Sequence, residues 1–288
     1  MFMLQERYAA LTQGFKQVLP DKSFRINTLK APKDLIKRLE DKGVVVKKID
    51  FLKNGYTYHS KFSLGSTLEY LMGYIYLQEA ASQVPVEVLS PSEEDVVLDM
   101  AASPGSKTTQ LASMMNNKGL VYAVEKDKRR ISSLVNNLER CGVSNTMVFN
   151  MNALDVKKLG VEFDKILLDA PCSGNFCVEE DFFNKRKVSD FSNRSALQKR
   201  LLEEACDVLK KDGVLVYSTC SLEPEEDEEV VSWALKNLPL DIIPLEVGDR
   251  GVAEFYGKEY DKRVIGCSRF WPHRHKTQGF FVARFKKL

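Results

Sequence analysis

The chain contains 288 residues, of which 44% are hydrophobic and 28% are charged, and its formal net charge is +2. This composition is ordinary for a globular protein and excludes a disordered, collagen-like or coiled-coil chain. No run of about 18 apolar residues is present, and the first residues lack the basic and apolar regions of a signal peptide. We therefore expect a cytoplasmic protein of about two domains, without a membrane span.

Positive charge is concentrated toward the two ends of the chain. Residues 1–92 and 258–288 carry an excess of Lys and Arg, and the region between them carries an excess of Asp and Glu. Basic ends around an acidic centre suit contact with a polyanion, although scattered solvated lysines explain the pattern equally well. With three histidines and no C-x-x-C pair among six cysteines, no metal site is expected. The acidic run 223–229 is interpreted as a helix N-terminus.

The first 92 residues predict a small α/β domain. Its expected helices cover 3–18 and 33–42, its expected strands cover 24–29 and 44–49, and segments 64–66 and 73–78 are ambiguous. The turn Ser90-Pro91-Ser92 precedes a change of pattern, which places the expected boundary between residues 92 and 93.

From Val96 onward, strands and helices alternate regularly. Strands are expected over 96–100, 120–125, 146–150, 165–169, 213–218, 241–245 and 279–285, and helices over 107–115, 129–140, 196–211 and 225–236. This alternation predicts a mostly parallel, doubly wound sheet of seven strands. Such sheets bind ligands at the carboxyl ends of their strands, so the residues that follow each strand matter most.

The first two of these strands end in residues suited to a nucleoside ligand. After the first strand, Asp99–Thr108 is rich in small residues, and Gly105 lets the backbone approach a ligand closely. The loop lacks the spacing of a P-loop, which argues against a nucleotide triphosphatase. Glu125 ends the second strand, where its carboxylate is interpreted either as a partner of two ribose hydroxyls or as an exposed acid at a helix N-terminus.

Cysteines follow the fourth and fifth strands. Cys172 lies in the segment Asp169–Gly174, and Cys220 lies in the segment Ser218–Ser221. In an open α/β sheet these two strand ends lie beside the end of the first strand, so both thiols and Asp169 are expected to converge on one crevice. A thiol in such a position can serve as a nucleophile.

With these motifs the chain resembles the NOP/SUN-type (RsmB-like) RNA cytosine-5 methyltransferases, which use S-adenosylmethionine. The similar segments are Arg25–Leu29, Gln78–Ser82, Asp99–Thr108, Asp169–Gly174, Ser218–Leu222, Arg269–His273 and Gly279–Ala283. Their occurrence in order over nearly the whole chain makes the resemblance specific. It implies a Rossmann-like class I methyltransferase domain preceded by a small RRM-like α+β domain.

The resemblance also implies a role for each matched position. Cys220 is implied to be the nucleophile that adds to C6 of cytosine, Cys172 to assist product release, and Asp169 to lie beside the base. Residue 152 is usually an aspartate in the family, and here it is Asn152. The residues implied to bind S-adenosylmethionine, and its product S-adenosylhomocysteine, are Ala101, Ala102, Ser103, Pro104, Gly105, Ser106, Lys107, Glu125, Arg130, Asn152 and Asp169.

RNA contacts are expected at Arg25, Asn27, Lys187, Arg269 and Arg274, although Arg25 and Asn27 could instead join the two domains. The expected substrate is tRNA, because the chain is close to the minimal core of the family, and the expected state is a monomer. Three alternatives stay open: a ribosomal RNA methyltransferase, a non-catalytic RNA-binding assembly factor, and a DNA cytosine methyltransferase with Cys172 as its nucleophile. Asn175, Phe176 and Asp227 depart from the family pattern and leave the substrate preference open.

Overall fold

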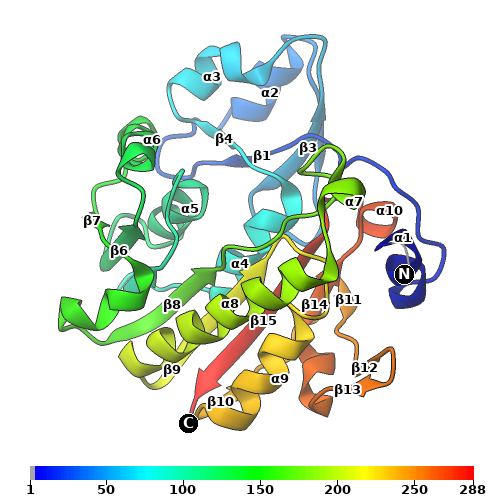
Figure 1. Ribbon diagram of the computed structural model, residues 1–288. Helices are drawn as coiled ribbons and strands as arrows, with labels where there is room; N and C mark the ends of the chain where they lie inside the picture. Colours follow the sequence, from blue (N-terminus) through cyan, green and yellow to red (C-terminus); the bar gives the residue numbers. More distant parts are fainter. Residues whose placement is uncertain (1–3) are drawn as a thin grey trace.

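An antiparallel sheet of four strands forms the N-terminal domain of the computed structural model, which describes residues 4–288 (Figure 1). The strands are β1 (Ser23–Ile26), β2 (Val45–Lys48), β3 (Gly55–His59) and β4 (Ile75–Leu77), in the order β2-β3-β1-β4. The helical segments of this domain are α2 (Leu35–Glu40), η1 (Leu64–Ser66) and α3 (Leu68–Leu71). Helix α1 (Leu4–Leu11) lies apart from them, because its Tyr8 packs in a cluster with Trp271 of the large domain. This strand order is that of a split βαβ unit, which confirms the expected RRM-like domain.

Several N-terminal elements differ from their predicted bounds. The first helix ends at Leu11 rather than at residue 18, and residue 3 lies outside the described residues. The strand predicted to end at residue 29 ends at Ile26, because the Asn27 side chain accepts a hydrogen bond from the Leu29 amide and turns the chain. Strand β3 was not predicted at all.

The large domain is built on a nine-stranded mixed sheet rather than a seven-stranded one. Strands β5 to β9 run parallel in the order β7-β6-β5-β8-β9. Successive strands are added on one side of β5 up to β7 and on its other side from β8 onward, so the topological switch point lies between β5 and β8. Antiparallel β15, β14 and β11 extend the sheet beyond β9, and β10 pairs with β15. The bounds are β5 (Val96–Asp99), β6 (Leu120–Glu125), β7 (Thr146–Asn150), β8 (Phe163–Asp169), β9 (Leu209–Thr219), β10 (Leu240–Ile242), β11 (Asp249–Arg250), β14 (Ser268–Phe270) and β15 (Phe280–Lys287).

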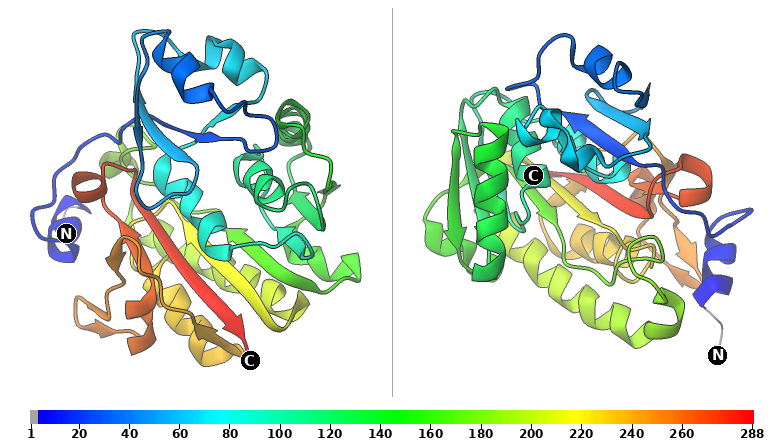
Figure 2. Two further views of the ribbon diagram at one scale, coloured as in Figure 1. Left: turned by 180° about the vertical axis from the view of Figure 1, so that it is seen from behind. Right: turned by 90° about the horizontal axis from the view of Figure 1, so that it is seen from above.

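Helices cover both faces of this sheet (Figures 1 and 2). Ile166 and Leu168 of β8 pack on one face against α8 and α9, and Leu167 packs on the other face against α4 and α5. A strand that is covered on both sides reads as a continuous apolar run, which explains the sequence of β8. The helical segments are α4 (Ala80–Leu89), α5 (Ser106–Met114), α6 (Lys128–Cys141), η2 (Ala153–Leu159), α7 (Phe182–Lys185), α8 (Val188–Val208), α9 (Glu228–Asn237), η3 (Lys262–Gly266) and α10 (Pro272–His275), and a short hairpin joins β12 (Glu254–Phe255) to β13 (Lys258–Glu259).

Helix α4 precedes the boundary expected at residue 92 but packs on the large sheet. Its residues Ala81, Val84 and Leu89 share one buried cluster with Val97 of β5 and Val282 of β15. The packing therefore favours a domain boundary before Ala80, and the boundary at 92 stays a prediction. No helix in the described part of the chain is long and apolar enough to cross a membrane.

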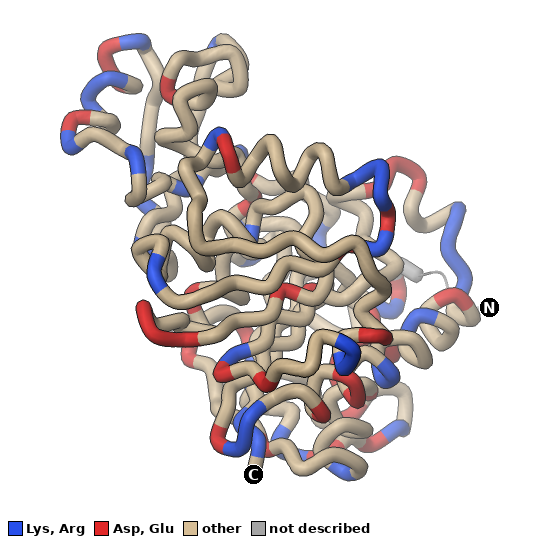
Figure 3. The backbone as a smooth tube through the Cα atoms, turned by 90° about the vertical axis from the view of Figure 1, so that its left-hand side faces the viewer, with Lys and Arg blue, Asp and Glu red and all other residues tan. Residues whose placement is uncertain are grey.

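Positions of Lys and Arg are interspersed with positions of Asp and Glu along the backbone drawn in Figure 3. In this view Lys and Arg alternate with Asp and Glu along both the small domain and the large one. Individual side chains, rather than overall charge, must be considered for any contact with RNA.

Candidate active site

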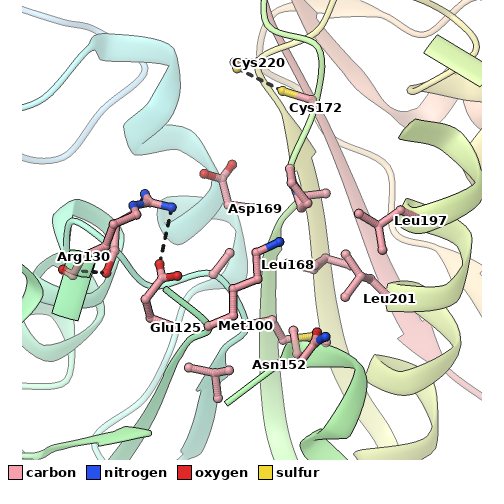
Figure 4. Close-up of a pocket in the computed structure, with 17 residues that line it drawn as sticks. Met100, Glu125, Arg130, Asn152, Leu168, Asp169, Cys172, Leu197, Leu201 and Cys220 are labelled. Carbon is pink, nitrogen blue, oxygen red and sulfur yellow. Dashed lines mark hydrogen bonds and ion pairs between the residues drawn. The ribbon is translucent and has the colours of Figure 1, made fainter. Parts of the chain in front are cut away.

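A cavity of about 320 Å³ opens at the carboxyl edge of the parallel strands. This volume falls within the range of sites for small ligands and cofactors, roughly 300–1,000 Å³. Figure 4 shows side chains from the ends of β5, β6 and β8 facing helix α8 across this space. The lining residues are Met100, Ala101, Ser103, Val124, Glu125, Lys126, Arg130, Asn152, Ala153, Leu168, Asp169, Ala170, Pro171, Cys172, Leu197, Leu201 and Cys220.

The loop after β5 has a fixed shape. Buried Asp99 accepts hydrogen bonds from the Thr108 hydroxyl at 2.7 Å and from the Ala101 amide at 3.3 Å. Burial raises the pKa of Asp99 to about 6. Gly105 precedes α5 with a φ of +102°, a conformation that glycine adopts without strain. The loop thus ends directly before the N-terminus of α5, and its residues Met100, Ala101 and Ser103 line the cavity.

Six of the eleven residues predicted to bind the cofactor line the cavity, namely Ala101, Ser103, Glu125, Arg130, Asn152 and Asp169. The remaining five, Ala102, Pro104, Gly105, Ser106 and Lys107, shape the loop and the start of α5 without lining this space. The prediction missed Leu197 and Leu201 of α8, which form the opposite wall. Their apolar spacing along the helix predicts only a buried face and does not indicate what that face covers.

Glu125 is placed to accept hydrogen bonds from a ligand. Its side chain is only 4% exposed and lines the cavity at the end of β6. One carboxylate oxygen accepts a hydrogen bond from the Asp127 amide at 2.8 Å, and the other oxygen lies 3.4 Å from Nη1 of Arg130. Arg130 also donates to the Ser103 carbonyl at 2.6 Å and so ties the loop after β5 to the start of α6. Glu125 is therefore a partly satisfied carboxylate in a preformed cavity, rather than an exposed acid.

Asp169 lies between the loop after β5 and the two cysteines (Figure 4). Its carboxylate accepts a hydrogen bond from Nζ of Lys107 at 2.7 Å and another from the Ser218 hydroxyl at 2.7 Å. These contacts fix its orientation from α5 on one side and β9 on the other. Lys107 thus acts on the site through Asp169.

The two thiols lie side by side at the tips of neighbouring strands. The Sγ atoms of Cys172 and Cys220 are 3.0 Å apart, and both residues line the cavity (Figure 4). The contact with Cys220, together with burial, raises the pKa of Cys172 well above its usual range. Cys172 therefore keeps its proton at neutral pH, and either thiol can donate the S–H in this contact.

The backbone that carries Cys220 is held by a residue that departs from the family pattern. Nδ2 of Asn175 donates to the carbonyl of Cys220 at 2.6 Å and to the carbonyl of Gly279 at 2.9 Å. Asn175 is fully buried, and its neighbour Phe176 belongs to an aromatic cluster with Trp271. These two departures therefore have a structural role next to the cysteine.

The acidic run after Cys220 is buried rather than solvated. Helix α9 begins at Glu228, not at residue 225 as predicted, and the side chains of Glu223, Glu226, Asp227 and Glu228 are 0% exposed. Two arginines that are distant in the sequence pair with it. Arg269 contacts Glu228 and Asp227, and Arg7 contacts Glu223 at 2.9 Å and Glu225 at 2.6 Å. Among residues 4–288, no group of three or more His, Cys, Asp or Glu side chains could hold a metal ion.

The structure corrects three of the five predicted RNA contacts. Arg25, Asn27 and Arg269 are 2%, 1% and 0% exposed, so their side chains are not accessible to RNA. Arg25 donates to Gln78, Ser106 and Thr109, and Asn27 donates to the carbonyls of Gly73 and Cys141. Both therefore join the two domains, as the alternative interpretation held. Lys187 and Arg274 are exposed, and their contact with RNA stays a prediction.

Comparisons with known proteins identify similar chains. The family model described as 16S rRNA methyltransferase RsmB/F matches residues 86–286, and that of the N-terminal domain of 16S rRNA methyltransferase RsmF matches residues 2–80. A crystal structure of a methyltransferase homolog protein from Pyrococcus horikoshii superposes with a TM-score of 0.88 at 43% identity, covering 94% of this chain and 88% of that chain. The RRM-like domain and the methyltransferase fold are thus found together in a solved relative.

Curated relatives modify both tRNA and ribosomal RNA. The chain is 36% identical to the tRNA (cytosine(49)-C(5))-methyltransferase of Pyrococcus abyssi, over 99% of this chain and 95% of that protein. It is 38% identical to the 28S rRNA (cytosine-C(5))-methyltransferase of Mus musculus over 92% of this chain. The chain spans only 35% of the length of the mouse protein and 57% of the length of the ribosomal RNA small subunit methyltransferase F of Vibrio parahaemolyticus.

Proposed function

The chain belongs to the RsmB/F methyltransferase family, and we propose that it transfers a methyl group from S-adenosylmethionine to C5 of a cytosine in RNA. The observation that carries the proposal is the meeting of two thiols and a carboxylate in one cavity. Cys220, Cys172 and Asp169 come from the ends of two adjacent parallel strands, and all three line the space that a ligand can enter. A scaffold that only binds RNA has no need of this arrangement.

The residues around the cavity fit the proposed cofactor. Among the described residues, the buried Glu125 carboxylate accepts a hydrogen bond from the Asp127 amide and pairs with Arg130, which leaves acceptor positions for the two ribose hydroxyls. Asn152 lines the same space, and its amide can donate to and accept from the adenine. The backbone of residues 101–103 would hold the methionine part. When bound, S-adenosylmethionine supplies a methyl group on a positively charged sulfur and leaves as S-adenosylhomocysteine.

The two cysteines have different parts in the proposal. Cys220 passes its proton to solvent water, and the resulting thiolate adds to C6 of the cytosine. The electron pair of the C5–C6 double bond moves into the ring, which makes C5 electron-rich and ready for methylation. After methylation the C5 proton leaves to a base, the bond between Sγ and C6 breaks, and the electron pair returns to the Cys220 sulfur. Cys172 assists release because it keeps its proton and donates a hydrogen bond to that sulfur from 3.0 Å.

Asp169 orients the base in this proposal. Its carboxylate is held by Lys107 and Ser218 at the mouth between the cofactor loop and the thiols. There it can interact with N3 and the exocyclic amine of the cytosine and stabilise the charge that develops as the thiolate adds. To reach the thiols, the base must be extruded from the RNA.

We propose that exposed Arg274 and Lys187 bind the RNA backbone. Strands β14 and β9 are both antiparallel to β15, so their carboxyl ends lie at one edge of the sheet. Arg274 follows β14 and Cys220 follows β9, which places both at that edge. Lys187 follows the Cys172 loop and precedes α8. Replacing either residue by Ala should weaken binding uniformly across RNA sequences. It should also reduce the slope of log K against log salt concentration by about 1, because one phosphate contact is lost.

The preferred substrate in this proposal is tRNA, acted on by a monomer in the cytoplasm. The Pyrococcus abyssi tRNA enzyme supports this preference because the two chains match over nearly their full lengths. The ribosomal RNA relatives are longer proteins, and this chain corresponds to only part of them. Ribosomal RNA is therefore the second candidate.

The test is transfer of labelled methyl from S-adenosylmethionine to unmodified tRNA, ribosomal RNA and duplex DNA, followed by mapping of the modified cytosine. Label at one tRNA cytosine supports the proposal, label only in ribosomal RNA keeps the reaction and changes the substrate, and label only in DNA overturns it. The Cys220→Ala variant should bind RNA without methylating it, and retained methylation would overturn the assignment of the nucleophile. The Cys172→Ala variant should accumulate a covalent RNA adduct, visible as a slow band on a denaturing gel.

A further inference from the structure

We propose that Glu226 is the positioning residue that fixes the two cysteine thiols relative to each other. The role in catalysis rests on the proposed function, whereas the role in thiol geometry does not. Glu226 lies between the Cys220 loop and α9, and it is fully buried. Its carboxylate contacts neither the cavity nor any reacting atom, so the residue acts through its neighbours.

Both cysteines lie just beyond the last paired residues of strands β8 and β9. Strands β8 and β9 are paired in register up to Asp169 and Ser218. In the described chain, the last backbone hydrogen bond of this ladder runs from the Ala170 amide to the Ser218 carbonyl at 2.8 Å. The thiols two residues further on therefore need another connection to stay 3.0 Å apart.

Glu226 supplies this connection. The amide of Ser173, the residue after Cys172, donates to the Glu226 carboxylate at 3.0 Å, and the Ser173 hydroxyl donates to the same group. The hydroxyl of Ser221, the residue after Cys220, donates to it at 3.1 Å. Glu226 thus joins the residues that directly follow the two cysteines, and it adds to the hydrogen bond from Asn175 to the Cys220 carbonyl and to the contact between the Ser173 and Ser221 hydroxyls.

Two further contacts hold Glu226 itself in place. Gln198 of α8 donates from Nε2 to the carboxylate at 2.9 Å and to the carbonyl of Pro171 at 3.2 Å. The Tyr217 hydroxyl of β9 donates to the backbone carbonyl of Glu226 at 2.5 Å. The connection therefore rests on the sheet and on a long helix, rather than on loops alone.

The chemistry of the cluster requires a carboxylate. Four donors converge on Glu226, and a carboxylate offers about four acceptor positions and no donor. A glutamine of the same shape would turn an NH₂ group toward donors and break part of the cluster. No Lys or Arg of residues 4–288 forms an ion pair with Glu226, so its buried charge is held by hydrogen bonds alone. Burying such a charged group costs free energy, and a loop with a purely structural role can be held by neutral side chains at a lower cost.

The first test uses the folded protein without RNA or cofactor. Diamide takes two electrons and two protons from a pair of thiols, and the two sulfurs form a disulfide. Peptide mass spectrometry of the wild type should show rapid formation of the Cys172–Cys220 bond, and the Glu226→Gln variant should form it about tenfold more slowly, because the thiols lose part of their fixed proximity. The matched control is Glu229→Gln, which alters an acid three residues away that pairs with Lys199 and Lys258, and it should behave as the wild type.

The second test measures methyl transfer. Glu226→Gln should lower kcat by about 10²-fold, as expected for a displacement of reacting groups, and leave KM for RNA within about twofold. If this variant does not fold, Ser173→Ala and Ser221→Ala, which each remove one arm, should show smaller losses in both assays. The inference would be overturned if the Glu226→Gln variant formed the disulfide at the wild-type rate. It would also be overturned if the Glu226 and Glu229 variants changed this rate and kcat equally. Absence of methyl transfer by the wild type would instead refute the proposed function, and the diamide rates would still decide the role of Glu226.

Discussion

Replacing Arg269 by Met should destabilise the protein strongly without any direct effect on RNA binding. The guanidinium is 0% exposed and donates to Glu228 at 2.6 Å and to the Leu222 carbonyl at 3.0 Å, and it lies 3.2 Å from Asp227. Its removal leaves two buried carboxylates without a counter-charge. Breaking a buried pair in this way costs about 3–5 kcal/mol, which in a chain of this size lowers Tm by roughly 10 °C.

Denaturant-induced unfolding followed by circular dichroism measures this loss. The matched control is Arg274→Met, which removes an exposed pair with Asp249 and should change stability by no more than about 1 kcal/mol. A loss below about 1 kcal/mol for Arg269→Met, or a reduced RNA affinity of its folded fraction, would show that the arginine is not the internal counter-charge described above.

Three further predictions follow from single contacts. Glu125→Ala should weaken S-adenosylmethionine binding by about 10- to 100-fold in calorimetry, because charged hydrogen bonds contribute roughly 1.5–3 kcal/mol, and unchanged affinity would remove Glu125 from the cofactor site. Burial raises the pKa of Glu79 to about 7 from 4.5, so the contribution of this group to the free energy of unfolding is fully present below pH 4.5 and is lost as the pH rises through 7. The denaturation midpoint of Glu79→Gln should therefore fall less steeply between pH 4.5 and 7 than that of the wild type. Parallel plots of midpoint against pH for the two proteins would contradict the raised pKa. In Gly73→Ala the new Cβ would lie 2.0 Å from the Arg140 carbonyl oxygen at a φ of +73°, so limited proteolysis should release the N-terminal domain faster than from the wild type, and equal rates would contradict this reading.

The sequence was sufficient for the parts of the site that follow regular strands. Apolar runs and their spacing located β5, β6, β7 and β8, and the rule for ligands at carboxyl ends predicted that Asp169 and both cysteines meet in one crevice. Glu125 lines the same cavity, although the residues alone left it open between a partner of ribose hydroxyls and an exposed acid. Helix α4 was missed because Pro85 lies inside it, and proline normally indicates the end of a helix. The added strands β11 and β14 contain only two and three residues, which is too short for a periodic pattern.

The burial of charged residues could not be predicted from local pattern. In the sequence, a run of acidic residues after Cys220 predicts a solvated helix N-terminus, and an isolated arginine predicts a contact with a phosphate group. Here Arg7 reaches Glu223 across 216 residues, and Arg269 reaches Glu228 across 41 residues. These partners are brought together only by the fold, so each charge looks unpaired in the sequence.

The corrected roles of Arg25 and Asn27 change what the N-terminal domain contributes to the site. Arg25 donates to the Ser106 carbonyl and the Thr109 hydroxyl in the first turn of α5, the helix that begins at the cofactor loop. Asn27 donates to the carbonyl of Cys141 at the end of α6, and the neighbouring Lys30 donates to that of Arg140. The small domain is therefore anchored at one end of each of the two helices that flank the loop after β5. These hydrogen bonds oppose a movement of the small domain relative to the loop after β5, so the N-terminal domain contributes to the site by fixing the two helices beside the cavity.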